Sequence, residues 1–203
     1  QQLLVTNEPP EGTLVEIGGS YEDQQESFGD LMTLLILIII LVYIVMATQF
    51  ESFKMPFIIL FSLPFAFTGV FLALYLTNTA LSVIALIGAI MLVGIVVKNG
   101  IVMVDFANLL RERGLSVSQA VIAAGKSRLR PVLMTTLTTI LGMLPLALGI
   151  GEGSETWQPM GVAVIGGLTF STMLTLIVVP IVYTIFCASS LKKERRQLKK
   201  ANR

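Results

Sequence analysis

The chain has 203 residues, of which 54% are hydrophobic and only 13% are charged, and its formal net charge is +1. A soluble domain carries about 25% charged residues, and here the charge is absent from long continuous windows. This composition excludes an ordinary soluble domain and is typical of a protein that crosses a membrane several times. The lack of histidine excludes imidazole metal sites, and the single cysteine, Cys187, cannot form an internal disulfide.

The first segment of the chain, residues 1–20, is polar and acidic. Residues 13–17 form a candidate strand, and Ser20 is a typical helix cap because an acidic residue, Asp23, follows three positions later. The sequence starts without a methionine or a signal sequence. We therefore expect it to be a piece of a longer polypeptide.

Five apolar stretches follow, and each is long enough to cross a bilayer as a helix with a rise of about 1.5 Å per residue. A proline within the second stretch, Pro64, predicts a kink there. A short surface helix is predicted at residues 116–124, before a fourth span that begins after Arg130 and Pro131. The sequence therefore predicts an all-α membrane domain over residues 21–190 and a basic tail over residues 191–203, with spans at residues 31–47, 57–76, 81–106, 132–150 and 160–187.

The distribution of charge predicts the orientation of these spans. Apart from Lys98, every Lys and Arg falls in the bend at 48–56, in the loop at 105–130 or in the tail, which alternate spans place on one side. The segments on the opposite side carry nine acidic residues and no Lys or Arg. Because cytoplasmic segments are enriched in basic residues, we expect the N-terminus outside and the C-terminus in the cytoplasm.

Lys98, followed by Asn99, is a charged residue inside the third span. A charge at the centre of a membrane helix costs at least about 2.5–3.5 kcal/mol, so it needs a partner or a route to water. One interpretation is that the long side chain reaches the cytoplasmic interface. The other is that Lys98 faces the helix bundle and pairs with a carboxylate that these five spans do not supply.

A cluster of threonines in the fourth span lies at a depth similar to that of Lys98. Thr135, Thr138, Thr139 and Gly142 share one helix face through their spacing of three, four and seven residues. The cluster indicates a polar partner for Lys98 on a neighbouring helix. The alternative is that each hydroxyl bonds to its own backbone or packs against a neighbouring helix.

Several strings of the sequence resemble the C-terminal part of resistance–nodulation–division efflux pumps, and within them the hydrophobe/amphiphile multidrug branch. These strings are GGSYEDQQESFGDL, ATQFESFKMP, LVGIVVKNGIVMVDFAN and RLRPVLMTTLTTILGMLPLALGIGEG. The resemblance implies that residues 1–20 end a periplasmic porter domain and that the membrane domain forms the last five of twelve spans.

The resemblance also implies site residues, because the proton-relay positions of that family match Lys98, Asn99, Thr135 and Arg128. Their implied partners are two aspartates on the fourth span of the N-terminal half, which this chain lacks. The implied activity is proton-driven export of hydrophobic or amphiphilic compounds across the bacterial inner membrane, without a cofactor, a metal or enzymatic chemistry. The implied assembly is a homotrimer in the lipid bilayer with a periplasmic adaptor and an outer-membrane channel, and no nucleic acid.

Two alternatives remain open at this stage. The chain could act as a truncated, non-transporting membrane scaffold that modulates a complete pump. It could also belong to a metal-exporting member of the same superfamily, although the sequence lacks an evident ladder of paired methionines.

Overall fold

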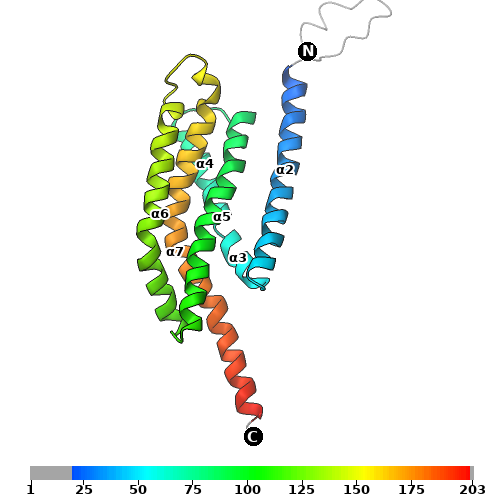
Figure 1. Cartoon of the computed structure of the whole chain (residues 1–203). Coiled ribbons are helices and arrows are strands. Elements are labelled where there is room, and N and C mark those ends of the chain that lie inside the picture. The colour runs from blue at the N-terminus through cyan, green and yellow to red at the C-terminus, as the bar shows by residue number, and fades with distance from the viewer. Residues whose placement is uncertain (1–19, 202–203) are drawn as a thin grey trace, which may run out of the picture.

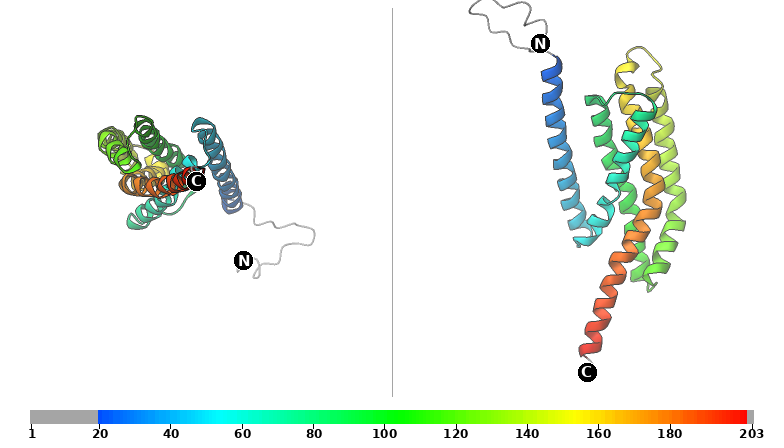
Figure 2. Two further views of the ribbon diagram at one scale, coloured as in Figure 1. Left: turned by 90° about the horizontal axis from the view of Figure 1, so that it is seen from below. Right: turned by 180° about the vertical axis from the view of Figure 1, so that it is seen from behind.

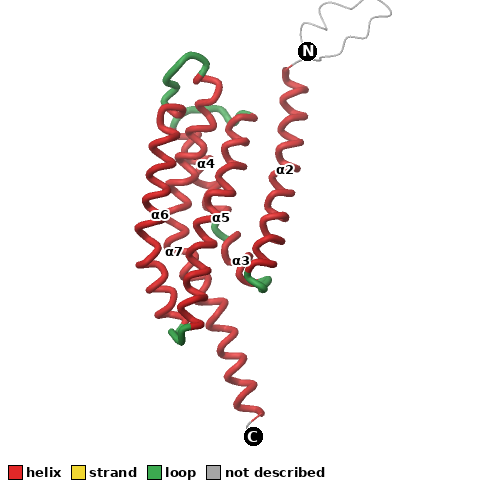
Figure 3. Tube along the Cα trace, in the orientation of Figure 1, coloured by secondary structure: helices red, strands yellow, loops and turns green. Residues whose placement is uncertain are grey.

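The computed structural model describes the backbone of residues 20–201 and the side chains of residues 23–187. This part of the chain consists of helices and loops, without a strand (Figures 1 and 3). The helices are α2 (Ser20–Gln49), α3 (Lys54–Leu60), α4 (Leu63–Leu76), α5 (Val83–Glu112), α6 (Val117–Ala147) and α7 (Ser154–Ala201). By length and composition, five helical segments of the described chain could cross a membrane, with α3 and α4 together forming the second. The all-α, five-span prediction is thus confirmed, whereas the candidate strand at residues 13–17 lies outside the described residues.

The second span is interrupted where the sequence predicts a kink. Helix α3 ends at Leu60 and α4 begins at Leu63, one residue before Pro64. Pro64 has no backbone N–H and cannot continue the hydrogen-bond ladder of α3. Between the two helices, the buried hydroxyl of Ser62 donates to the Ile59 carbonyl over 2.7 Å, which satisfies a backbone group inside the membrane.

Helix α6 corrects one prediction about the loop after the third span. Ser116 starts the helix with a capping box, in which the Ser116 hydroxyl accepts from the Gln119 backbone N–H at 3.4 Å. The helix then continues through Pro131 to Ala147. The prediction of a separate surface helix is wrong, because a proline inside a membrane helix removes one backbone bond without ending the helix.

Helix α7 is the centre of the packing, since it lies against α4, α5 and α6. Glycines allow this close approach: a Cβ added at Gly69 of α4 would lie 2.9 Å from the Gly166 carbonyl oxygen of α7. Between α6 and α7, a Cβ added at Gly161 would lie 2.7 Å from the Ala147 backbone nitrogen. The four helices are thus packed backbone against backbone, as small residues permit in membrane bundles.

Helix α2 stands apart from this bundle and contacts it through α3 and one side of α5 (Figures 1 and 2). Only 11% of its most apolar window is buried, against 50% for α5 and α7. Many of its exposed side chains are large and apolar, among them Leu34, Ile36, Leu37, Ile40, Leu41 and Ile44. Such a surface requires lipid or another protein segment around it.

Candidate functional site

Lys98 lies on a face of α5 that the described chain leaves uncovered. Its side chain is exposed, and so are Gly94, four residues before it, and Asp105, seven residues after it. These spacings place the three residues on one side of the helix. A Cβ added at Gly94 would meet no atom within 4 Å, so this side of α5 is open to a further segment. Among the described residues, none forms an ion pair with Lys98.

Asp105 is not a local partner for Lys98, although it shares the open side of α5. Seven residues correspond to about 10 Å along the helix axis, which is beyond ion-pair contact. The expectation that these spans hold no carboxylate for Lys98 therefore agrees with the helix geometry.

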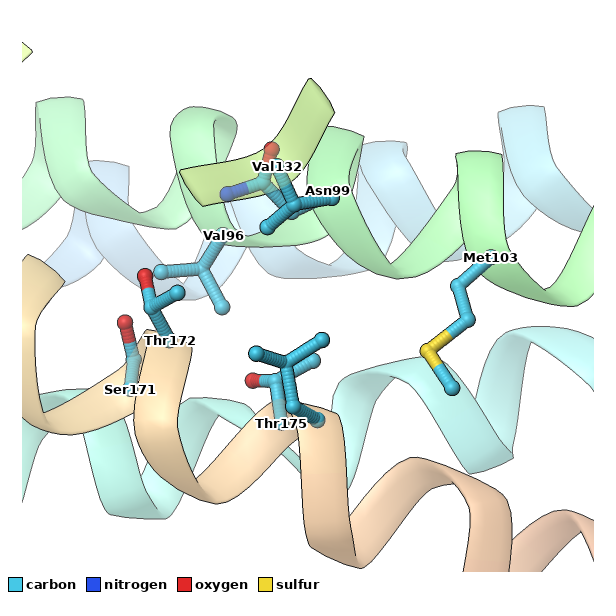
Figure 4. Close-up of a pocket in the computed structure, with 8 residues that line it drawn as sticks. Val96, Asn99, Met103, Val132, Ser171, Thr172 and Thr175 are labelled. Carbon is cyan, nitrogen blue, oxygen red and sulfur yellow. The ribbon is translucent and has the colours of Figure 1, made fainter. Parts of the chain in front are cut away.

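Asn99 points differently from Lys98, because each residue turns the helix by about 100°. Its side chain is half-buried and lines a small cavity between α5, α6 and α7. Figure 4 shows Asn99 on one side of this cavity and Thr172 and Thr175 of α7 on the other. The two adjacent polar residues of α5 thus face different surroundings, since Asn99 lines the cavity and Lys98 is exposed.

The threonines of α6 also differ in whether they are exposed or face α7. Thr135 is exposed and donates to the Val132 carbonyl at 2.9 Å, while Thr138 donates to the Met134 carbonyl at 2.8 Å. Thr139 likewise bonds its own helix, through the Thr135 carbonyl at 2.9 Å. No hydrogen bond joins Lys98 to Thr135 within the described residues, so the predicted relay pair stays a prediction.

Thr136 belongs to the same hydroxyl run of α6, but it lies off the face that Thr135, Thr138 and Thr139 share. It is only 5% exposed, and its hydroxyl is 3.2 Å from the hydroxyl of Thr172, which is also 5% exposed. This bond crosses from α6 to α7. The available signal was the hydroxyl run at Ser171, Thr172 and Thr175, which interrupts an otherwise apolar span.

Arg128, the remaining implied relay residue, lies against an aromatic ring. The centre of its guanidinium is 4.5 Å from the ring centroid of Phe106 on α5. Its buried Nε has no hydrogen-bond partner among the described residues. A cation over an aromatic face is attracted by the ring quadrupole, which holds the Arg128 side chain between α5 and α6.

A second polar cluster, which the sequence did not predict, joins the end of α5 to α7. The Tyr183 hydroxyl donates to the Asn108 side-chain oxygen at 2.5 Å. Arg111 donates to the Tyr183 hydroxyl at 3.4 Å and contacts the Cys187 sulfur at 3.6 Å. Cys187 is buried. The cluster fixes α7 just before its basic extension.

The described residues contain no group of three or more His, Cys, Asp or Glu side chains that could hold a metal ion. The polar side chains that line the cavity between α5, α6 and α7 are three hydroxyls and an amide. Such groups can exchange hydrogen bonds and respond to charge, but on their own they offer no acidic proton carrier.

Comparisons with known proteins place the chain in a family. A sequence model described as the AcrB/AcrD/AcrF family matches residues 1–187. The swarming motility protein SwrC of Bacillus subtilis is 43% identical over 185 residues, which are 91% of this chain and 18% of SwrC. The multidrug resistance protein MdtC of Proteus mirabilis is 42% identical over 205 residues, which are 95% of this chain and 20% of MdtC.

Solved structures give the same result for the fold. The crystal structure of a heavy metal efflux pump superposes with a TM-score of 0.75 and 32% sequence identity, covering 91% of this chain and 18% of that one. The chain spans about a fifth of the length of the curated relatives that it matches. These matches confirm the resemblance to resistance–nodulation–division pumps, and the chain belongs to the AcrB/AcrD/AcrF family.

Proposed function

We propose that this chain forms the last five spans of a proton-driven secondary transporter that exports hydrophobic or amphiphilic compounds. The single observation that carries the proposal is the position of Lys98, a cation within a membrane span on a side of α5 that nothing in the described chain covers. A charge in this position is a functional feature by default. Family membership and a relative named for multidrug resistance favour transport.

In this proposal, the open side of α5 and α6 receives the N-terminal half of the same polypeptide, which supplies two aspartates. While the aspartates are ionised, Lys98 is held near them, because opposite charges attract strongly where the dielectric constant is low. Protonation of an aspartate from the periplasm weakens this attraction and frees the ammonium. Lys98 then turns toward Thr135 or Asn99 and the helices shift, and proton release to the cytoplasm resets the site.

The hydrogen bonds around Thr135 are compatible with this role. The Thr135 hydroxyl uses its proton to donate to Val132, but its oxygen keeps lone pairs that can accept a bond from an ammonium. Arg128, with its unsatisfied Nε, is a second cation that favours ionised carboxylates on the neighbouring half. In this scheme the Lys98 ammonium moves between the aspartates and Thr135 or Asn99, which accept a hydrogen bond from it. Arg128 favours the ionised form of the carboxylates.

The proposal includes an orientation and an assembly. The acidic N-terminal end lies in the periplasm and the basic C-terminal end in the cytoplasm, across the bacterial inner membrane. Three complete polypeptides form a homotrimer, which works with a periplasmic adaptor and an outer-membrane channel. Residues 1–20 then end the porter domain, and residues 191–203 form the cytoplasmic tail.

The test uses the complete polypeptide that contains this chain, reconstituted into lipid vesicles. We expect a pH gradient to drive transport of an amphiphilic dye, and a protonophore to stop it. An equal rate of dye transport with and without the pH gradient would contradict proton coupling. No transport of any compound would favour the alternative of a membrane scaffold.

A second candidate, metal export, is favoured by the structural match to a heavy metal efflux pump. The same vesicles distinguish the two candidates. Gradient-driven movement of Zn²⁺ or Cu⁺ without movement of the dye would replace the amphiphile proposal with this one.

A further inference from the structure

The small cavity between α5, α6 and α7 is lined by an unusual number of polar side chains for the interior of a membrane bundle. Asn99 comes from α5, whereas Ser171, Thr172 and Thr175 come from α7 (Figure 4). The remaining lining is apolar and includes Met103. The cavity volume is ≈ 10 Å³. That is about the smallest space in which a single water molecule fits.

Some of these polar groups have hydrogen-bond partners among the described residues, and others have none. Ser171 donates to the Leu168 carbonyl at 3.2 Å, and Thr172 shares its bond with Thr136. The Thr175 hydroxyl, by contrast, has no partner among the described residues, although Thr175 is only 5% exposed. The Asn99 amide, which can form up to four hydrogen bonds, also has no partner there.

An unpaired hydroxyl in a buried residue costs free energy unless water reaches its oxygen. Among the described side chains, only Arg128 Nε is both fully enclosed and unpaired, so the Thr175 oxygen keeps surface that a water molecule can contact. Thr175 could bond its own helix, as Thr169 does with the Ile165 carbonyl. It instead faces a cavity whose opposite wall carries the unpaired amide of Asn99. A small molecule that donates and accepts would satisfy both groups at once.

We propose that this cavity holds one ordered water molecule, which bridges the Asn99 amide of α5 and the Thr175 hydroxyl of α7. Water fits the site better than a cation does. The lining contains no carboxylate to balance a positive charge, and Lys98 occupies the next position on α5. The water links α7 to the turn of α5 that carries Lys98, and the Thr136–Thr172 bond extends this polar connection to α6.

The test is radiolytic footprinting of the complete polypeptide, in which an X-ray pulse converts bound water to hydroxyl radicals that oxidise adjacent side chains. Met103 lines the cavity and is 3% exposed, whereas Met46 is 1% exposed and lies in the core away from it. We expect Met103 to form sulfoxide several-fold faster than Met46. Equal rates for the two methionines would overturn the proposal.

Two variants identify the source of the oxidation, because a second cavity near Tyr183 also borders Met103. Thr175→Val removes the hydroxyl and keeps the shape, so the oxidation rate of Met103 should fall to that of Met46. Thr169→Val, which changes an exposed threonine of the same helix, should leave the rate unchanged. Full oxidation of Met103 in Thr175→Val would contradict the bridge. The readout needs neither substrate nor gradient, so it is independent of the proposed transport function.

Discussion

The two sides of the α5–α6 pair differ in how their polar groups are satisfied. On the side that faces α7, Asn99 lines a small cavity and Thr136 bonds across to Thr172. On the side that the described chain leaves uncovered, Lys98, which precedes Asn99, and Thr135, which precedes Thr136, are both exposed. One step along each helix thus separates a residue that faces α7 from one that the described chain leaves exposed.

Glycines follow the same division. Gly69 and Gly100 lie where an added Cβ would come within 3 Å of a neighbouring helix. Gly94 and Gly142 lie on the open side, where a Cβ would meet nothing within 4 Å. Because small residues in membrane helices allow another helix to approach, the open side has the character of an interface rather than of a lipid-facing surface.

The largest effect on stability is expected from Gly69→Ala. The new Cβ would lie 2.5 Å from the Phe170 Cβ and 2.9 Å from the Gly166 carbonyl oxygen, so α4 and α7 would have to separate. Overpacking of this kind costs about 1–3 kcal/mol. We expect a lower thermal unfolding midpoint for the complete polypeptide in detergent. An unchanged midpoint would show that the two helices are not packed this closely.

A smaller effect is expected from the contact between Arg128 and Phe106. Phe106→Leu removes the ring, while Phe106→Tyr keeps it as a matched control. A cation–π contact contributes about 0.5–2 kcal/mol. A double-mutant cycle with Arg128→Met, measured by thermal unfolding, should return a coupling energy in that range, and additive effects of the two changes would refute the contact.

Thr136→Val should lower the free energy of unfolding by a smaller amount, because it removes one hydrogen bond between hydroxyls and preserves the side-chain shape. Hydrogen bonds between membrane helices contribute on average about 0.6 kcal/mol. The unfolding midpoint of Thr136→Val should fall slightly, and adding Thr172→Val should cause little further loss, since the partner is already missing. Independent losses for the two changes would contradict the Thr136–Thr172 bond.

Thr135→Ala should have the smallest effect on stability, because the hydroxyl is exposed and bonds its own helix. We expect its consequence to appear in transport instead, as weakened efflux of several substrates by cells that make the complete polypeptide. Thr169→Ala is the matched control, since Thr169 of α7 is also exposed and also bonds its own backbone. Unchanged efflux of all tested substrates in Thr135→Ala would argue against a relay role for Thr135.

Much of the fold follows from the sequence, because hydropathy and length determine membrane spans almost independently of tertiary context. Pro64 marked the break between α3 and α4, and Ser116 marked the start of α6. The role of Pro131 was misjudged, since whether a membrane proline ends or only interrupts a helix depends on packing.

The site was harder to predict. The position of Lys98 inside a span was evident from the sequence, but its orientation depends on helix rotation. Helix rotation also decides that Thr136, and not Thr135, bonds to α7. The contacts of Tyr183 with Asn108 and Arg111 join residues more than 70 positions apart, and no local pattern indicates them.

The central claim is that Lys98 couples proton movement to transport. The most direct test compares Lys98→Met with Lys126→Met, which removes an exposed lysine of α6, in vesicles that contain the complete polypeptide. The measurement is the change of internal pH when an amphiphilic substrate is added. The account predicts that substrate-dependent proton movement disappears in Lys98→Met and persists in Lys126→Met, whereas normal proton movement in Lys98→Met would contradict it.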